Sequence, residues 1–343
     1  RQAQLLRRLR AGAGVATEER VAAAMYPRLV GDVGGTNARF AWIDVAGAAP
    51  VDVAVLRVAD HASLHDALAG YLAAHPRPGP QWAALGIATT VAGDHVRMTN
   101  HPWQFSIAAL QRTLGFERLL VVNDFAALAL ALPVLPPDAL RPVGGGRAAA
   151  GAPIGLLGAG TGLGVAGLVT LPCGPGVVPL GGEGGHVTLA AADDFEARVV
   201  ARLRERYGHA SAERALSGPG LENLHEALAR LDGVPAALLP AAEITARALA
   251  GGDALCVRTV ELFFALLGGV AGNLALTLGA RGGVYIGGGI VPKLGDWIER
   301  SAFRERFEAK GRFAGYLAQV PTWVVTAEVW PALVGAGRAL DVY

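Results

Sequence analysis

The segment from Leu29 to Phe40 constrains the fold of this chain more than any other stretch. It runs L-V-G-D-V-G-G-T-N-A-R-F: an apolar strand, an acidic residue, two glycines, two small polar residues and a second apolar run. Adjacent glycines permit a tight turn with positive φ and leave backbone N–H groups uncovered, a nest that can hold a phosphate chain. Asp32, at the strand end, is placed to hold a hydrated metal ion that accompanies the phosphates. A glycine pair alone usually marks only a turn, but Asp32, Thr36 and Asn37 favour phosphate binding.

A second glycine loop, within residues 153–169, repeats the strand, turn and strand. Its core, G-A-G-T-G-L-G from Gly158, is spaced like a dinucleotide-binding fingerprint. That fingerprint must open a helix and be followed by a ribose-binding acid about 20 residues later. Here the residues after the turn are rich in Val, Leu, Thr and Gly, which favours a returning strand. The two units therefore predict two related α/β lobes that close on the phosphates of one nucleotide.

Composition excludes several classes of protein. The 343 residues are enough for two α/β lobes, and 30 Lys and Arg against 29 Asp and Glu give no global field for nucleic acid or an anionic membrane. The only lysines are Lys293 and Lys310, and no G-x-x-x-x-G-K-[ST] motif is present. Cys173 and Cys256 are too few and too far apart for a disulfide framework or a zinc site, which fits a reducing cytoplasm.

Two other stretches could be mistaken for membrane or targeting segments. The apolar run 262–278 contains three glycines and Asn273, and we interpret it as a helix buried between the lobes. Residues 1–24 are rich in arginine, but they include Glu18 and Glu19 and lack an apolar h-region. We therefore expect residues 1–27 to be an N-terminal extension.

Hydrophobic spacing and turn residues predict the remaining elements. Ser106 and Gly115 should bound a helix, and a Pro- and Gly-rich stretch should join the lobes. The expected segments are a helix over 61–74, a strand over 83–88, a hairpin over 90–100 turning at Gly93-Asp94, a helix over 106–114, a junction over 133–151, a strand and glycine turn over 284–292, and a final strand and helix over 322–340 that returns to the first lobe.

Asp124 is the strongest candidate for chemistry in the first lobe. It follows a short apolar strand over 119–122 and precedes a helical pattern that starts at Phe125. Ligands of open α/β sheets bind at the carboxyl ends of strands, and the helix dipole favours an ionised carboxylate at a helix start. Asp124 is thus either the acceptor of a hydroxyl proton or only a helix cap. The neighbouring Asn123 favours a polar ligand.

The loop G-G-E-G-G-H, which starts at Gly181, places Glu183 and His186 three residues apart between glycines. Both side chains can reach one small ligand, and acceptors of this kind suit a sugar, which offers only hydroxyl groups. Metal binding is the alternative, but no convincing third ligand lies nearby in the sequence. Glu213 would by default be a surface helical acid.

Several motifs in order make the chain resemble the bacterial glucokinases of the hexokinase and actin-like ATPase superfamily, from Leu29 nearly to the C-terminus. The stretches that carry the resemblance are GDVGGTNARF from Gly31, MTNHPWQFS from Met98, VVNDFAALA from Val121, GAGTGLGVA from Gly158, GEGGHV from Gly182, ERALSGPGL from Glu213, GGVYIGGGIVPK from Gly282 and KGRF from Lys310.

The resemblance implies a two-lobed α/β fold of the actin-like ATPase (ribonuclease H-like) type with a central cleft. The small domain would span 28–134 plus 324–343, and the large domain 135–323. The resemblance also implies that the protein phosphorylates glucose with ATP and Mg²⁺. It further implies a homodimer in the cytoplasm with no nucleic-acid or membrane partner.

Residue roles follow from the same resemblance. Asp124 would be the catalytic base, and Asp32 would hold the metal through water. The implied sugar ligands are Asn100, Asn123, Asp124, Glu183, His186 and Glu213. The implied ATP-binding residues are Gly31, Asp32, Val33, Gly34, Gly35, Thr36, Gly158, Gly160, Thr161, Gly162, Gly287, Gly288 and Gly289.

Some features depart from the family, and alternatives stay open. Residues 88–91 stand where the family commonly has a small residue and a proline, and the junction at 144–151 is enlarged. The cysteine-rich zinc motif of the related repressor and kinase group is absent. A sugar-sensing repressor would need a helix-turn-helix before Leu29, and an actin-like filament protein would not need Glu183 and His186. A kinase for mannose or N-acetylglucosamine, or one using ADP or polyphosphate, is not separated from a glucokinase by these motifs.

Overall fold

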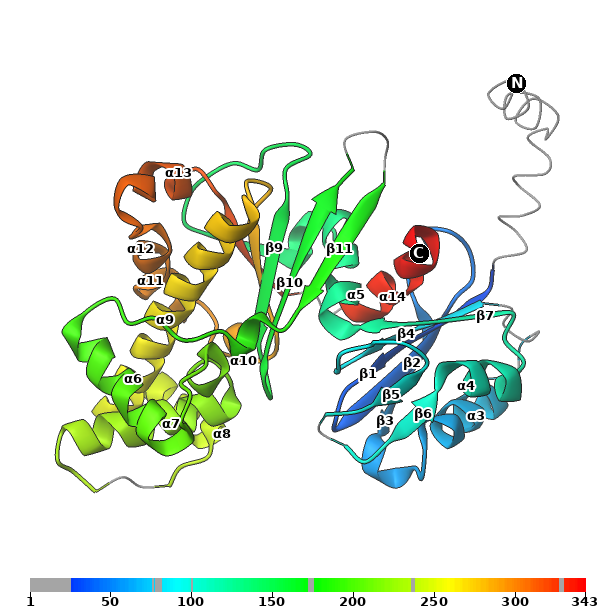
Figure 1. Cartoon of the computed structure of the whole chain (residues 1–343), viewed down its shortest axis with the longest axis horizontal. Coiled ribbons are helices and arrows are strands. Elements are labelled where there is room, and N and C mark those ends of the chain that lie inside the picture. The colour runs from blue at the N-terminus through cyan, green and yellow to red at the C-terminus, as the bar shows by residue number, and fades with distance from the viewer. Residues whose placement is uncertain are drawn as a thin grey trace. The chain divides into compact units, whose positions relative to one another are not determined.

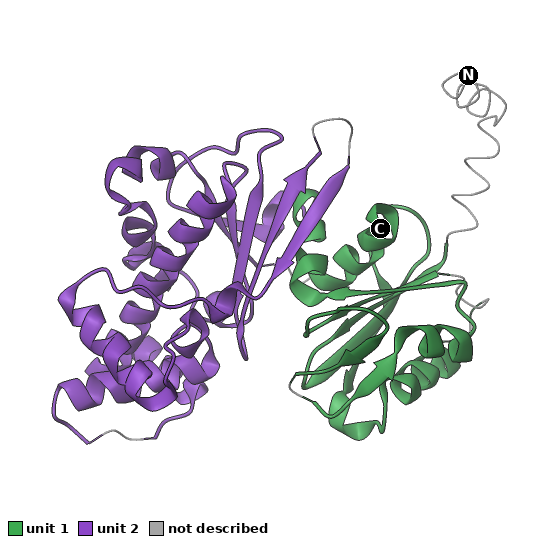
Figure 2. Ribbon diagram, in the orientation of Figure 1, with its two compact units in different colours: residues 1–133, 330–343 green, residues 134–329 purple. Residues whose placement is uncertain are grey.

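The computed structural model describes residues 26–75, 77, 82–99, 101–171, 176–235, 238–326 and 330–343. The chain divides into two compact units, Arg1–Pro133 with Trp330–Tyr343, and Val134–Val329 (Figure 2). Each unit is an α/β domain with its own sheet (Figure 1). Residues 1–25 of the extension expected over 1–27 lie outside the described residues.

Unit 1 is built on a five-stranded sheet with the order β3-β2-β1-β4-β7. Strands β1 to β3 form an antiparallel meander, and β4 and β7 continue parallel to β1. A two-stranded ribbon of β5 and β6 accompanies the sheet. The elements are β1 (Arg28–Val33), β2 (Asn37–Ile43), β3 (Val51–Arg57), α3 (Leu64–Ala74), β4 (Trp82–Ile87), β5 (His95–Arg97), β6 (Gln104–Ser106), α4 (Ile107–Leu114), β7 (Arg118–Asn123), α5 (Asp124–Ala131) and α14 (Pro331–Val342).

Both faces of the unit 1 sheet are covered, which explains the continuous apolar run in β1. Leu29 and Val33 pack in one core cluster with Leu68 of α3, whereas Val30 packs in another with Leu333 of α14. Successive side chains of a strand point to opposite faces. Asp32 therefore lies on the face of Val30, which α14 covers.

Unit 2 is built on a six-stranded sheet with the order β11-β10-β9-β12-β13-β8. Its strands are β8 (Leu140–Val143), β9 (Ile154–Ala159), β10 (Leu163–Thr170), β11 (Val177–Gly182), β12 (Val284–Gly287) and β13 (Thr322–Val325). Its helices are α6 (Asp194–Tyr207), α7 (Gly218–Leu231), α8 (Ala241–Ala250), α9 (Ala254–Leu278), α10 (Ile290–Lys293), α11 (Trp297–Arg300), α12 (Phe303–Glu308) and α13 (Ala314–Ala318).

The two sheets share one topology. In unit 2, β9 to β11 form an antiparallel meander, and β12 and β13 continue parallel to β9, as β4 and β7 continue from β1 in unit 1. Each glycine loop is the first turn of its meander. The prediction of two related α/β lobes is confirmed at this level, and so is the returning strand after Gly162, since the motif opens no helix.

The long apolar helix predicted over 262–278 is the second part of α9. Among the described residues α9 alone is long and apolar enough to cross a membrane, yet 61% of its most apolar window is buried inside the protein. It packs against α12, α7, α8 and β9 of its own unit. Its length and composition are therefore those of a core helix.

One expectation about local structure is wrong, and one turn closes without the positive φ that its glycines permit. The hairpin predicted over 90–100 does not form, because β5 pairs with β6, and Asp94 instead accepts the N–H of Ala108 at the start of α4. The turn after β1 closes without positive φ at Gly34 or Gly35, through a bond from Gly34 N–H to Asn37 O of 2.9 Å. The helix predicted between Ser106 and Gly115 is confirmed, with both residues as its caps.

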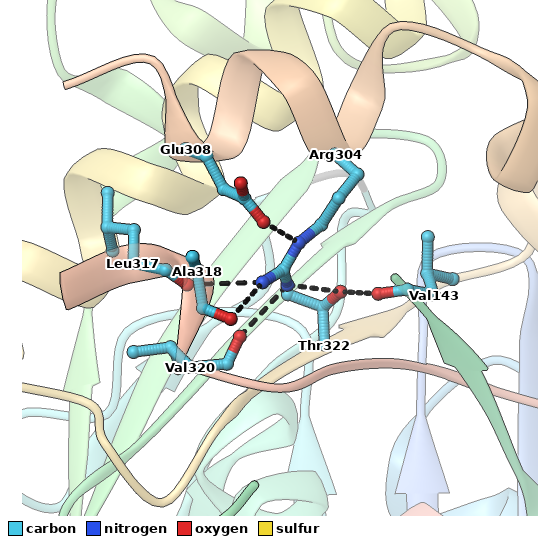
Figure 3. Close-up of polar contacts among 7 residues, drawn as sticks. All are labelled: Val143, Arg304, Glu308, Leu317, Ala318, Val320 and Thr322. Carbon is cyan, nitrogen blue, oxygen red and sulfur yellow. Dashed lines mark hydrogen bonds and ion pairs between the residues drawn. The ribbon is translucent and has the colours of Figure 1, made fainter. Parts of the chain in front are cut away.

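Arg304, near the start of α12, joins this helix to the segment 317–322 that leads into β13 (Figure 3). Its guanidinium donates to the carbonyls of Leu317, Ala318 and Val320 over 2.9–3.1 Å, and it pairs with Glu308 over 2.5 Å. Thr322 Oγ1 lies 3.4 Å from Nη1 and donates to Val143 O. One side chain thus fixes the approach to β13.

Candidate active site

The first glycine loop joins β1 to β2 and lies at the carboxyl end of β1. Asp32 is the second-last residue of that strand, and its side chain is 17% exposed. Thr36 O accepts the N–H of Val58 over 2.9 Å, which fixes the far side of the turn while Thr36 stays exposed. The predicted phosphate hairpin therefore exists as a hairpin, with a buried carboxylate beside it.

Arg39 pairs with Asp32 across the hairpin, and the sequence argument missed it. Its Nη1 lies 2.7 Å from Asp32 Oδ2, and its guanidinium stacks 5.1 Å from the ring centre of Trp330. Burial raises the pKa of Asp32, and the charge and hydrogen bond of Arg39 partly offset that rise. The register Asp32↔Arg39 follows from the closing pair Val33↔Ala38, so counting back from the turn would have found it.

Asn123 and Asp124 stand where β7 passes into α5. Asn123 is the helix cap, because its side-chain oxygen accepts the N–H groups of Phe125 and Ala126 over 3.0 and 3.1 Å. Asp124 is the first helical residue, and its Oδ1 accepts the N–H of Phe125 over 2.9 Å. The interpretation of Asp124 as the helix cap is therefore wrong, because Asn123 caps the helix.

Asp32, near the end of β1, and Asp124, directly after β7, lie at the same edge of the parallel strands β1, β4 and β7, with β4 between them. The register runs Val33↔Ile87↔Asn123 across β1, β4 and β7, and adjacent strands are about 4.8 Å apart, so the two acids are separated by about 10 Å. Gly86 lies between them: a Cβ there would be 3.5 Å from Asp124 Cα. No side chain from β4 fills the space between the two acids.

A hydroxyl pair supports the Asn123 side chain. Asn123 Nδ2 donates to Thr89 O over 3.3 Å, and Thr89 Oγ1 bonds both Arg97 O and Thr99 Oγ1 over 3.0 Å. Thr89 lies in the segment that departs from the family pattern. In this chain its hydroxyl links that segment to residues 97 and 99. The neighbouring candidate Asn100 lies outside the described residues.

The second glycine loop, in unit 2, is held from two sides. Gly160 N–H bonds Gly162 O, and Gly218 N–H at the start of α7 bonds Gly160 O, both over 2.8 Å. The turn at 287–289 follows β12, where Gly287 pairs with Gly158. Gly288 has φ +80°, and a Cβ on it would lie 2.3 Å from Ala159 O. Two of the predicted ATP-binding segments therefore meet at the ends of β9 and β12.

Glu183 and His186 flank one turn of 3₁₀ helix, residues 184–186, directly after β11. Glu183 Oε2 and His186 Nε2 are 3.9 Å apart, and both side chains are more than half exposed. The structure thus brings this predicted pair together on the surface of unit 2.

Glu213 connects this part of the unit to the second glycine loop. Its Oε2 accepts the backbone N–H of Leu163 over 2.9 Å, and a Cβ on Gly162 would lie 2.5 Å from the same oxygen. Ser217 Oγ donates to Glu213 O over 2.8 Å, which fixes the backbone of the acid. Ala212 N–H bonds Val187 O over 2.9 Å, so the segment after His186 runs beside Glu213. The default interpretation of Glu213 as a surface helical acid is therefore wrong.

The donor set for a metal is sparse. In the described ranges no three His, Cys, Asp or Glu side chains come together. Mg²⁺ commonly keeps several waters and binds through one or two carboxylates plus substrate phosphates. Asp32 beside the first glycine loop fits that mode, and the rival metal site at Glu183 and His186 lacks a third ligand.

Comparison with known proteins agrees with this geometry. A family model described as Glucokinase matches residues 29–342. A glucokinase from Aromatoleum aromaticum is 57% identical, with 92% of this chain and 95% of that protein covered, and one from Chromobacterium violaceum is 52% identical, with 92% and 89% covered. The crystal structure of a glucokinase from an Antarctic psychrotroph is 38% identical and covers 92% of this chain and 98% of its own, with a TM-score of 0.84. The chain belongs to the glucokinase family.

Proposed function

We propose that this protein transfers the γ-phosphoryl group of ATP to the 6-hydroxyl of glucose. The observation that carries the proposal is the bond between Glu213 and the Leu163 N–H. It joins a carboxylate suited to sugar hydroxyls to the loop suited to phosphates. Family membership supports the same reaction.

The sugar is held by acceptors and amides. Glu183, His186 and Glu213 would bind hydroxyls from unit 2, and Asn100, Asn123 and Asp124 from unit 1. Each buried carboxylate–hydroxyl bond contributes about 1.5–3 kcal/mol, because one partner is charged. Several such bonds are needed to hold a neutral polyol in water.

The nucleotide is held by the glycine loops. The segment from Gly31 to Thr36 would bind phosphate oxygens in unit 1 through backbone N–H groups other than that of Gly34, which bonds Asn37 O. The segment from Gly158 to Gly162 would do so in unit 2 through groups other than the Gly160 N–H, which bonds Gly162 O. Gly287 to Gly289 would lie on the adenosine side. Asp32 would hold Mg²⁺ through water, and that ion would neutralise charge on the β- and γ-phosphates. Arg39, in turn, orients the Asp32 carboxylate and partly offsets the rise in its pKa that burial causes.

Asp124 would act as the general base. The dipole at a helix start favours a carboxylate anion, and the Phe125 N–H holds one carboxylate oxygen of Asp124. The 6-hydroxyl proton passes to this carboxylate as the hydroxyl oxygen bonds to the γ-phosphorus, and ADP leaves with the bridging oxygen. Positioning and charge neutralisation supply most of the catalysis, since phosphoryl transfer has a loose transition state.

We also propose the finer architecture and setting. The two lobes would form an actin-like ATPase (ribonuclease H-like) fold, with unit 1 as the small domain and unit 2 as the large domain. The expected return to the small domain at residue 324 is moved to Trp330, because β13 (Thr322–Val325) pairs with β12 in the unit 2 sheet. They would close over a central cleft and exclude water, which competes with glucose as the acceptor. The protein would work in the cytoplasm as a homodimer.

A coupled assay across sugars and phosphoryl donors tests this function. We expect the highest kcat/KM with glucose and ATP, and lower values with mannose, N-acetylglucosamine, ADP or polyphosphate. A higher kcat/KM for another hexose or donor would replace glucose or ATP in the proposal. Sugar-independent ATP hydrolysis with filament assembly would overturn it.

A further inference from the structure

A cavity lies in unit 2, lined by residues to which the proposed reaction assigns no role. Its volume is about 380 Å³, within the range of about 300–1,000 Å³ typical of small-molecule sites. Strand residues Leu157 and Val165, the α9 residues Leu266, Val270 and Leu274, and the segment 187–192 line it, with the end of α12 at one side. The lining is thus mostly apolar.

The buried acid Glu196 ties two walls of this cavity together. Its side chain is only 2% exposed, and it accepts the N–H of Ala192 over 2.8 Å. It also pairs with Arg306 of α12 over 2.7 and 2.9 Å. Because one carboxylate bonds both the 187–192 segment and α12, it fixes two walls of the cavity relative to each other.

Lys310 leaves one positive charge in this cavity unbalanced. Arg306 is neutralised by Glu196, whereas in the described parts of the chain no carboxylate pairs with Lys310, whose Nζ donates to Gly269 O over 3.0 Å. An ammonium has three N–H donors, so donors remain for a ligand. Burial, together with the neighbouring Arg306, lowers the pKa of Lys310, and the Glu196 carboxylate offsets only part of this. Both effects would be relieved by an anion.

The cavity also touches the segment that carries the sugar-side residues. Gly184, Val187 and Thr188 line it, and Val187 O accepts the N–H of Ala212, next to Glu213. A molecule in the cavity would therefore contact the backbone that carries Glu183 and His186. Through the bond from Ala212 to Val187, this backbone is also linked to the segment that carries Glu213.

We propose that this cavity binds a small amphipathic anion, with its acidic group at Lys310 and its apolar body against Leu266, Val270 and Leu274, and that this ligand is coupled to sugar binding. The coupling rests on the proposed function, whereas the binding does not. Coupling between two sites is reciprocal, so each ligand changes the affinity of the other by the same factor.

Calorimetry with octanoate, octanol and octylammonium, each below self-association, tests the binding. Octanoate should bind the full-length protein, and the neutral and cationic analogues should bind at least about tenfold more weakly. Lys310→Met should weaken octanoate by about tenfold, and Lys293→Met, at the other lysine, should not. Thr277→Trp, at an exposed lining residue, should block binding. Thr113→Trp, at an exposed helical threonine of unit 1 with the same bond to its i−4 carbonyl, should not.

The coupling is measured as the glucose dissociation constant with and without saturating octanoate. We expect a change of about fivefold or more, within the usual range for coupled sites, in the wild type and in Lys293→Met but not in Thr277→Trp. Equal binding of all three analogues, or octanoate binding unaffected by Lys310→Met, overturns the site. Octanoate binding without a change in glucose affinity overturns the coupling. Octanoate binding by a protein that binds no glucose leaves the site standing and refutes the proposed function instead.

Discussion

Glu213 and Leu163 are joined by a hydrogen bond of 2.9 Å from the Leu163 backbone N–H to the Glu213 carboxylate. Leu163 is the first residue of β10, directly after the second glycine loop. The proposed sugar side and the proposed phosphate side of unit 2 therefore share one contact. A change in either is expected to reach the other.

Gly162→Ala should weaken glucose binding even when no nucleotide is present. The new Cβ would lie 2.5 Å from Glu213 Oε2 and displace the carboxylate. Loss of one charged hydrogen bond costs about 1.5–3 kcal/mol, or about 10- to 150-fold in affinity. Isothermal titration of the variant with glucose measures the change.

Gly160→Ala is the matched control, since a Cβ there has no atom within 4 Å. Glucose affinity without nucleotide should stay within about twofold of the wild type. Equal losses in both variants would mean that the loop, and not its contact with Glu213, controls sugar binding.

Asp124→Asn should lower kcat by about 10²–10⁴-fold, because an amide cannot accept the 6-hydroxyl proton. Glucose should still bind, since the amide can bond a hydroxyl. The helix should persist, because its cap is Asn123. Rapid-quench kinetics with chemistry rate-limiting give the test, and retention of more than about a tenth of wild-type kcat would place the base elsewhere.

Glu183→Gln and His186→Ala should each weaken glucose binding by about 5- to 150-fold, equivalent to about 1–3 kcal/mol. Binding of a non-hydrolysable ATP analogue, measured without sugar, should change by less than about twofold. A large loss of analogue binding would instead assign this loop to the nucleotide.

Asp32→Asn should become relatively more stable as the pH rises from 4 to 7. The pKa of Asp32 in the folded protein lies above its ordinary value of 3.8 because of burial. The folded state therefore holds the proton more tightly than the unfolded state, and the wild type loses stability as pH rises through that raised pKa. An amide does not titrate.

Urea unfolding of both proteins at pH 4, 5.5 and 7 gives the difference in stability at each pH. The test is how this difference changes with pH. The cost of leaving Arg39 unpaired is the same at every pH, so it does not affect that change. A difference that is independent of pH, or that falls as pH rises, would contradict the assignment.

Arg304→Lys should destabilise unit 2 by about 2–4 kcal/mol, because an ammonium cannot serve Glu308 and three carbonyls in one plane. Arg202→Lys, at an exposed arginine of α6, should cost less than about 0.5 kcal/mol. Thermal unfolding of both variants makes the comparison, and equal shifts would refute the role of Arg304.

The strands, helix caps and glycine turns were predictable because they depend on local patterns. Ser106 and Gly115 cap α4 as their residue types indicate, and the apolar run before Asp124 forms β7. The pairing of β5 with β6 was not predictable, because it depends on tertiary packing and not on the Gly93-Asp94 turn.

Contacts between distant segments were the least predictable part of the site. The place of Glu213 depends on a backbone N–H fifty residues away, and no spacing rule reports such a pair. Arg39 could have been found from the hairpin register alone. The interpretation of Asp124 as a cap failed because two adjacent polar residues compete for one position, and Asn123 takes it.

The return of the chain to unit 1 sets the order in which this protein can fold during synthesis. Helix α14 packs on α5, β1 and β4, and its Leu333 and Leu340 are buried against Val30 and Ala84. These residues are made only after the whole of unit 2. Domains fold as units while the chain emerges, N-terminal parts first. Unit 1 begins before unit 2 but can be completed only after it, so one face of the unit 1 sheet stays uncovered while unit 2 is translated.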